Sequence, residues 1–203
     1  MLAAPAVSRK TQKQQTRQRL LRVAFRQFSE KGLTATRTLD IARKAGVAHG
    51  TIFVHFPSRE ELLVKVIEKF GEKVTRKMHE LAYRGKGVRD VLEAHLEGLA
   101  QYEAFYGRLV AERHLLPRQA RDTLLGIQSA ISFHLFEAAQ KEMAAGKIKQ
   151  VPMHLLFNTW IGLVHQYLQN RDLFAPGGSV IARYGSELLD HFMKLLSTEK
   201  GER

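Results

Sequence analysis

Residues 38–56 read TLDIARKAGVAHGTIFVHF, and the spacing of their apolar side chains predicts two short helices joined by a tight turn. The first helix is expected over residues 38–44 and the second over residues 48–54, with residues 45–47 between them. Gly46 can adopt the left-handed backbone conformation that such a turn needs. This arrangement is typical of a helix-turn-helix, although similar spacing also occurs in helical hairpins that serve only the fold.

The side chains of this motif divide into an apolar set and an outward set. Ile41, Val47 and Ile52 would contact neighbouring helices. The outward side chains of the second helix are small, hydrogen-bonding or aromatic, and none is a carboxylate that would repel a phosphate backbone. They are His49, Gly50, Thr51, Phe53 and His55.

Outside this motif, nearly every segment repeats its apolar residues at a period close to 3.6, and no alternating pattern of a β-strand is present. The expected fold class is therefore all-α. Ser58 and Glu61 form a capping box at the start of a long helix that runs to about residue 82. Further helices are expected over 15–31, 88–104, 106–115, 117–145, 153–169 and 179–197.

Positive charge is concentrated at the start of the chain. Residues 1–59 hold 12 of the 32 Lys and Arg but only 2 of the 20 Asp and Glu, so this segment carries +10 of the net +12. This asymmetry indicates a polyanionic partner for the N-terminal segment, the alternative being a basic tail with no specific partner. Residues 1–14 are expected to form a flexible basic arm, and Arg9, Lys10, Lys13 and Arg17 either follow a DNA groove or do nothing specific.

The composition excludes several classes of site. Without cysteine, the chain has no disulfide, no thiol nucleophile and no thiolate metal ligand. No two of the nine histidines lie three or four residues apart, so no metal and no cofactor are expected. The chain shows no enzyme motif, no signal peptide and no apolar run long enough to span a membrane. We therefore expect a cytoplasmic protein that is not an enzyme and has no membrane partner.

Several short motifs in the first 65 to 70 residues together resemble the amino-terminal signature of the TetR family of bacterial transcriptional regulators. They are Gly32-Leu33, Thr36, Asp40-Ile41-Ala42, Ala45-Gly46-Val47, Gly50-Thr51-Ile52-Phe53, His55-Phe56 and Ser58-Arg59-Glu60-Glu61-Leu62. The remainder of the chain fits the family in length and helical pattern only. The resemblance implies a helix-turn-helix DNA-binding domain over residues 15–58 and a helical ligand-binding and dimerisation domain over residues 59–203.

The same resemblance implies roles for individual residues. His49 matches a position that faces the bases, and Thr51 matches a phosphate or base contact. The family usually has Tyr at the position of Phe53, so the phenolic hydrogen bond to phosphate is missing here and Phe53 would only pack against sugar. Positions that contact the DNA backbone are matched by Thr38, Phe53, His55 and Arg59.

Arg37 replaces the hydroxyl that usually caps the first helix of the motif. The cap must then come from Thr36 or Thr38, or be absent, and Arg37 could instead reach a phosphate.

Aromatic and histidine side chains of the C-terminal two-thirds are candidates for a ligand pocket between helices. The ligand would be apolar or aromatic, with His114 or His134 holding an acidic or hydroxyl group. Ordinary core packing is the alternative for each residue. The candidates are His95, Tyr102, Tyr106, His114, Phe133, His134 and Trp160.

The last two long helices carry wide apolar faces, and two such helices from each of two subunits would pack as a four-helix dimer interface. The alternative is that both faces are buried within one subunit. The expected interface residues are Leu156, Leu163, Tyr167, Tyr184, Leu188 and Phe192.

These observations favour a homodimeric repressor that binds double-stranded DNA at a pseudo-palindromic operator and is released by a small-molecule effector. The effector would act by shifting the long helix that begins near Ser58. Three alternatives remain open: an effector-independent or activating regulator of the same fold, a nonspecific nucleic-acid-binding protein, and a helical enzyme with an unrecognised pocket.

Overall fold

The structure, a computed structural model, describes residues 8–82 and 87–198, and all the elements named within these ranges are helices. The predicted all-α fold is confirmed. The helices are α1 (Arg9–Lys31), α2 (Thr38–Ala45), α3 (His49–His55), α4 (Arg59–Ala82), α5 (Val88–Ala100), α6 (Glu103–Ala111), the 3₁₀ helix η1 (Arg113–Leu115), α7 (Arg118–Ala144), α8 (Met153–Gln169), α9 (Arg171–Phe174) and α10 (Val180–Leu196).

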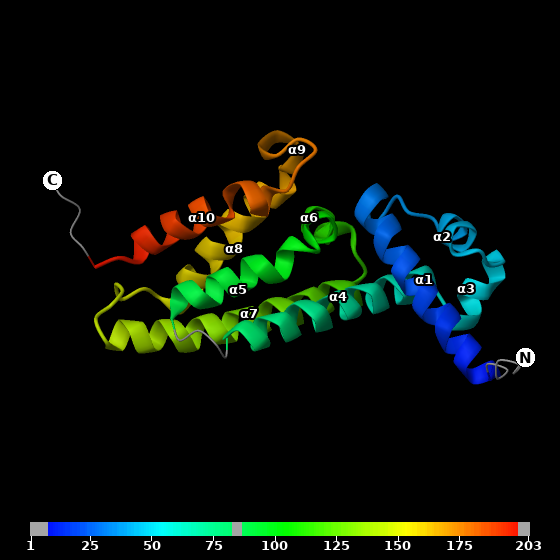
Figure 1. The fold of residues 1–203 in the computed structure, drawn as a ribbon, viewed down its shortest axis with the longest axis horizontal. Coiled ribbons are helices and arrows are strands. Elements are labelled where there is room, and N and C mark those ends of the chain that lie inside the picture. Colours follow the sequence, from blue (N-terminus) through cyan, green and yellow to red (C-terminus); the bar gives the residue numbers. More distant parts are fainter. Residues whose placement is uncertain (1–7, 83–86, 199–203) are drawn as a thin grey trace, which may run out of the picture.

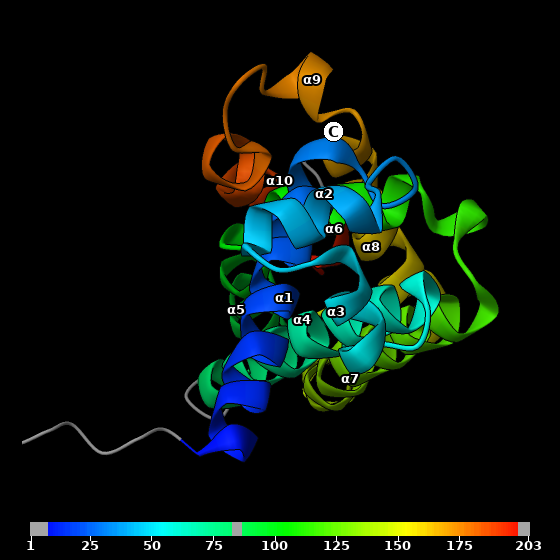
Figure 2. The same ribbon diagram turned by 90° about the vertical axis from the view of Figure 1, so that its right-hand side faces the viewer.

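Helices α1, α2 and α3 gather at one end of an elongated molecule, and the remaining helices form a bundle at the other end (Figure 1). The long helix α4 belongs to both parts, because it starts beside α1 and then packs along α5 and α7. Viewed from the end that carries the motif, α2 and α3 lie in front of the bundle (Figure 2). The helix-turn-helix is therefore presented at one tip of the molecule.

Three helix boundaries differ from those expected. Helix α1 begins at Arg9 rather than near residue 15, because the Ser8 hydroxyl accepts a hydrogen bond from the Thr11 N–H. Residues 9–14 of the expected arm are thus helical, and residues 1–7 lie outside the described part. The segment predicted as one helix over 88–104 is interrupted by a turn, in which the Tyr102 N–H donates to the Leu99 carbonyl.

The helix expected over residues 106–115 is in fact α6, which starts at Glu103 and is followed by η1. Helix α9 was not predicted, because its four residues are too few for a periodic pattern.

A single hydrophobic cluster runs through both parts of the molecule, from Leu20 on α1 to Leu196 on α10. Helix α1 joins the two parts because it packs against α4 and α6 as well as α2. Helices α4 and α7 approach closely at Gly71, where a Cβ atom built on the glycine would lie 2.6 Å from Cγ1 of Ile127. A larger residue at position 71 would force the Ile127 side chain or one of the helices to shift.

The loop between α1 and α2 is held from two sides. Glu112, at the end of α6, accepts hydrogen bonds from the backbone N–H groups of Leu33 (3.0 Å) and Thr34 (2.7 Å), and from the Thr34 hydroxyl (2.7 Å). From the other side, the Arg59 guanidinium donates to the carbonyls of Leu33, Thr34 and Thr36. This loop leads directly into the helix-turn-helix, so α6 and α4 together fix where the motif sits.

The other end of α6 makes a similar contact. The buried carboxylate of Glu103 accepts hydrogen bonds from the N–H groups of Val180 and Ile181 and from the Ser179 hydroxyl, at the start of α10. A carboxylate at a helix N-terminus satisfies free N–H groups and interacts favourably with the helix dipole. Helix α6 therefore connects the start of α10 to the loop that precedes the motif.

We predict that Glu112→Ala lowers the free energy of unfolding by roughly 1–3 kcal/mol, because two backbone N–H groups lose a charged acceptor. Urea unfolding followed by circular dichroism measures this loss. Glu97→Ala, which removes an exposed carboxylate from α5, is the matched control and should change stability little. Equal stabilities of the Glu112 and Glu97 variants would contradict the assigned role of Glu112.

Candidate functional site

The turn between α2 and α3 has the geometry that its sequence predicts. Gly46 lies in the left-handed region with φ 65° and ψ 41°, and the Val47 N–H donates to the Ala42 carbonyl at 3.1 Å. Ala42 and Ile52 are buried, so the two helices pack closely against the core. This packing leaves the opposite side of α3 facing solvent.

The solvent-facing side of α3 presents most of the predicted DNA-binding residues. His49, Gly50 and Phe53 are exposed, whereas Thr51 and His55 are half-buried. Phe53 keeps 43% of its surface exposed and so remains available for packing against a partner. Val54, 68% exposed, also lies on this surface and was not anticipated, because an apolar residue there resembles a core position in the sequence.

Two of the predicted contact residues bind each other. The Thr38 hydroxyl, at the start of α2, lies 2.9 Å from Nε2 of His49, and the ring of His49 contacts that of Phe53 with centroids 5.3 Å apart. These contacts restrict the orientation of the imidazole ring on the exposed surface. His49 is therefore held in place before any partner arrives.

Helix α2 begins without a side-chain cap, one of the alternatives that the sequence left open. Thr36 cannot serve as the cap, because its buried hydroxyl donates to the carbonyls of Gly32 (2.7 Å) and Gln27 (3.1 Å). Arg37, at the N-cap position, is exposed. Its guanidinium is thus free to meet a phosphate.

Arg59 makes contacts within the protein that its predicted role as a contact to the DNA backbone does not include. Its guanidinium is half-buried and is used by three carbonyls of the loop between α1 and α2. These bonds use Nε and one terminal nitrogen of the guanidinium. Arg59 therefore positions the loop that leads into the motif, and its contact to the DNA backbone stays a prediction.

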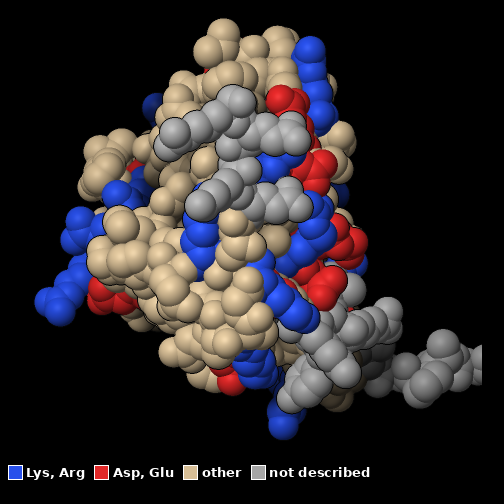
Figure 3. Space-filling view, turned by 90° about the vertical axis from the view of Figure 1, so that its left-hand side faces the viewer, with Lys and Arg blue, Asp and Glu red and all other residues tan. Residues whose placement is uncertain are grey.

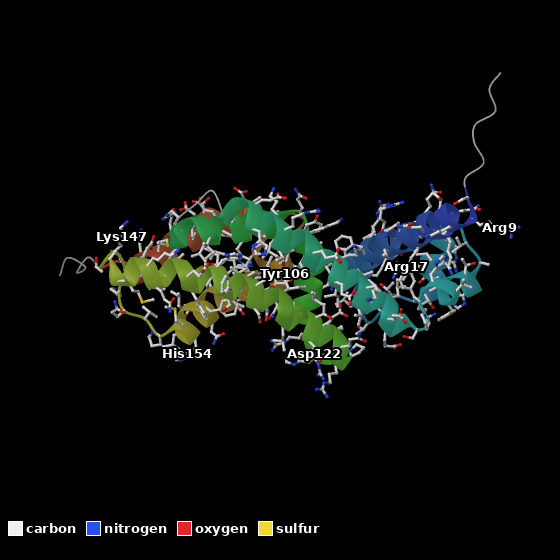
Figure 4. The ribbon with its side chains drawn as sticks, turned by 90° about the horizontal axis from the view of Figure 1, so that it is seen from below. Arg9, Arg17, Tyr106, Asp122, Lys147 and His154 are labelled. Carbon is white, nitrogen blue, oxygen red and sulfur yellow. The ribbon has the colours of Figure 1, made fainter. Side chains whose placement is uncertain are left out.

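His55 lies beside the basic side of α1. Burial lowers the pKa of its imidazole, and the charges of Lys13 and Arg17 lower this pKa further. Arg17 also lies over the ring of Phe56, 4.8 Å from its centroid. At neutral pH His55 is therefore an uncharged hydrogen-bonding group, and the positive charge of this edge comes from α1, along which Arg9 and Arg17 lie (Figure 4).

The seven predicted pocket residues do not come together. His95, Tyr106 and Trp160 are buried in the bundle, and Tyr102 is half-buried where the bundle meets α1. His114 and Phe133 are exposed, because they lie on the outer sides of η1 and α7. One pocket lined by all seven was therefore a wrong prediction, since the helical pattern does not say which of several apolar surfaces a residue faces.

His134 pairs with His79 across α7 and α4, with Nε2 of His134 2.8 Å from Nδ1 of His79. Burial, and then the proximity of His79, lowers the pKa of His134.

In the described ranges, no group of three or more His, Asp or Glu side chains gathers in a way that could hold a metal ion. Across the same ranges, no helix is long and apolar enough to cross a membrane.

Two polar pairs, one buried and one partly buried, lie within the bundle, where Tyr106 is near the middle of the molecule (Figure 4). The Trp160 Nε1–H donates to Nδ1 of His95 at 3.0 Å, which places the proton of the neutral imidazole on Nε2. That Nε2 has no hydrogen-bond partner among the described residues. Nearby, the Tyr106 hydroxyl lies 2.8 Å from Nε2 of His165, a residue that was not among the predicted site residues.

Burial governs the ionisation of these groups. It lowers the pKa of His95 to about 3 and that of His165 to about 4, and it raises the pKa of Tyr106 to about 12. All three side chains are therefore neutral at neutral pH.

The predicted dimer residues separate into two groups. Leu156, Leu188 and Phe192 are buried within their own subunit, so their assignment to the interface was wrong. Leu163, Tyr167 and Tyr184 remain half-buried on the outer side of α8 and α10. Residues buried within the subunit and residues on its outer side repeat with the same helical period. The sequence therefore does not show which of them the neighbouring helices cover.

We predict that the protein loses stability as the pH falls below about 6.5. In the unfolded chain His95 and His165 take up protons at their ordinary pKa, whereas in the folded protein burial lowers the pKa of both. The free energy of unfolding is therefore at its full value at neutral pH and decreases toward pH 4. Each residue accounts for roughly 2 kcal/mol by about pH 5. Thermal unfolding should show a weaker pH dependence in His95→Gln/His165→Gln, while His154→Gln, at an exposed position, leaves it unchanged.

Comparisons with known proteins agree with this architecture. The sequence model described as bacterial regulatory proteins of the tetR family matches residues 20–66, which include α2 and α3. An HTH-type transcriptional repressor of Mycobacterium tuberculosis is 34% identical over 100 residues, 48% of this chain and 50% of that protein. The chain thus matches about half the length of these curated relatives.

Solved structures share the fold over most of the chain. A putative transcriptional regulator from Saccharomonospora viridis, solved in complex with choline, has a TM-score of 0.77 at 16% identity and covers 92% of this chain and 100% of its own. The transcriptional regulator FadR from Bacillus subtilis, solved in complex with stearoyl-CoA, has a TM-score of 0.69 at 18% identity, with coverage of 86% and 96%. Residues 20–66 therefore carry a segment like that of the tetR family of bacterial regulatory proteins, and the chain as a whole shares the fold of the solved structures.

Proposed function

We propose that this protein is a sequence-specific DNA-binding transcriptional regulator, in which residues 15–58 bind the DNA. The exposed side of α3 carries this proposal, because it presents His49, Gly50 and Phe53 without any carboxylate. A helix with small, aromatic and hydrogen-bonding side chains fits the major groove, where base edges are read by such contacts.

The distribution of charge supports the same orientation. Arg37 is exposed beside α3, and the first turns of α1 present Arg9, Lys10 and Lys13 to solvent. At the opposite end of the molecule, basic and acidic side chains are interspersed (Figure 3). A duplex would therefore be attracted to the tip that carries the motif.

The finer features of the proposal are repression, dimerisation through residues 59–203 and release by a small apolar or aromatic molecule. A relative in Mycobacterium tuberculosis is a repressor, and two proteins of similar fold were solved with choline and with stearoyl-CoA. Inside this chain, the unpartnered Nε2–H of His95 is a buried donor that a ligand could satisfy if the helices around it separated. The operator would be pseudo-palindromic, as two-fold symmetry requires.

A second copy of this chain is the proposed partner of α8 and α10. Leu163 and Tyr167 on α8 lie beside Tyr184 on α10, and the rings of Tyr167 and Tyr184 are 5.2 Å apart. The stripe extends to Leu155 and Leu195, which are half exposed. An apolar stripe on two adjacent helices, bordered by Glu187 and His191, suits a four-helix contact between two subunits.

We predict that the protein prefers DNA from the upstream region of its own gene over scrambled DNA by about a thousandfold at physiological salt. Fluorescence anisotropy across a salt series measures both affinities. Equal affinities that fall together with salt would replace the proposal with nonspecific nucleic-acid binding.

His49→Ala should weaken binding to the specific site by roughly tenfold, since one good base contact is worth 1–3 kcal/mol, and should leave binding to scrambled DNA unchanged. His154→Ala is the matched control, because this exposed histidine lies at the start of α8, far from the motif (Figure 4). Equal losses in the two variants would remove His49 from the interface.

For the dimer, Leu163→Glu should convert the protein to a monomer of 23.1 kDa in light scattering, because it buries a carboxylate in the proposed interface. Leu125→Glu alters an exposed leucine on α7 and should leave the dimer intact. A wild-type monomer at micromolar concentration would overturn the proposed assembly.

A further inference from the structure

A groove of about 520 Å³ lies where α1 crosses α4 and the start of α6. Its volume is within the range of pockets that hold small organic ligands. Four aromatic residues form its floor: Phe25 packs against Phe105 with centroids 4.6 Å apart, and Phe70 contacts the half-buried Tyr102 at 5.6 Å. The floor is therefore an apolar surface whose exposure to water is unfavourable.

The rim of this groove is basic on both sides. Arg22 and Arg26 lie on α1, and Lys69 and Lys73 lie on α4, each pair four residues apart on one helix face. Like charges at this spacing destabilise a helix slightly, so an anion beside Arg22 and Arg26 would relieve a repulsion on α1, whereas on α4 the charge of Lys69 is already offset by Glu72.

Three of the four cations of the rim have no carboxylate partner among the described residues, whereas Lys69 pairs with Glu72 at 2.6 Å. Among the described residues, Arg22 and Arg26 have no ion-pair partner, and Lys73 lies only over the ring of Tyr102, 5.7 Å from its centroid. The one carboxylate of the lining, Glu30, already accepts from Gln27 at 3.0 Å and lies 3.9 Å from Lys44. The rim therefore keeps a net positive charge above an apolar floor.

We propose that this groove binds an amphipathic organic anion, with an apolar chain or ring against the aromatic floor and a carboxylate or similar group between α1 and α4. A DNA phosphate would use the cations but leave the apolar floor unused, whereas a neutral ligand would leave the cations unused. Binding in the groove does not depend on the proposed function, but its effect on DNA binding does. Such a ligand would touch α1 of the DNA-binding part and α4 and α6 of the bundle at once.

Isothermal titration calorimetry of the full-length protein with decanoate, in the absence of DNA, tests the proposal. We expect one decanoate per subunit, weaker binding at high salt, and at least about tenfold weaker binding of neutral decanol, a difference of ~1.4 kcal/mol. Equal binding of decanoate and decanol, or no binding of decanoate, would overturn the proposed site.

Two variants locate the bound molecule. Arg22→Gln/Lys73→Gln removes one cation from each side of the rim, and Ala104→Trp fills the groove from α6; each should weaken decanoate binding about tenfold or more. Arg118→Gln/Lys147→Gln removes two exposed cations elsewhere and should have no effect. If Ala104→Trp does not fold, Arg22→Gln/Lys73→Gln still tests whether decanoate binds in the groove. Unchanged affinity in both groove variants places the ligand elsewhere and overturns the proposal.

The two proposals fail separately. Specific DNA binding by the ligand-free protein, with no decanoate bound, would overturn only the groove. Decanoate binding that depends on Arg22 and Lys73, without any preference for the upstream DNA, would overturn the proposed function and leave the groove in place.

Discussion

The position of the helix-turn-helix depends on how the short loop before it is held. Glu112 binds the N–H groups of this loop from α6, and Arg59 binds its carbonyls from α4, so both kinds of backbone group are satisfied by charged side chains. Hydrogen bonds to charged groups are stronger than those between neutral ones. Because these two residues belong to different helices, any relative shift of α4 and α6 must either move the loop or break one set of bonds.

Helices α4 and α6 also border the interior of the bundle, so they connect the loop before the motif to α8 and α10. Helix α6 ends at the loop and begins at Glu103, whose carboxylate holds the start of α10. Beside α6 runs α8, whose Trp160 and His165 pair with His95 and Tyr106 in the core. A shift of α8 or α10 therefore has a direct structural path to the helix-turn-helix, through residues that are either buried or hydrogen-bonded to backbone.

Features that arise from local sequence were predictable. Gly46 sets the turn, Ser58 caps α4 and the helical period identifies the long helices, because each of these depends on residues a few positions apart. The Glu112 contact joins groups 79 positions apart and leaves no local pattern.

The same limit explains the contacts that the sequence did not predict and the assignments that were wrong. Arg59 has the sequence of a surface cation, and its use by the loop appears only when α1, α2 and α4 are packed together. Leu156 and Phe192 show the period of an apolar face but not which partner covers it. For the pocket, the sequence offered aromatic and histidine candidates without showing which surface each one faces. The groove at α1 borders a turn at Tyr102 that lacks the Gly or Pro by which turns are usually recognised.

The position of Gly71 at the middle of α4 means that a small rotation of the helix there would displace both of its ends. Gly71 is pressed against Ile127, and α4 extends roughly 18 Å to either side at 1.5 Å per residue. A rocking motion of about 5° around this point would displace the Arg59 end by about 1.6 Å, enough to lengthen ordinary hydrogen bonds beyond their limit. Because glycine carries no side chain, Ile127 packs directly against the backbone of α4, so the middle of the helix is also a point where α4 and α7 are in contact.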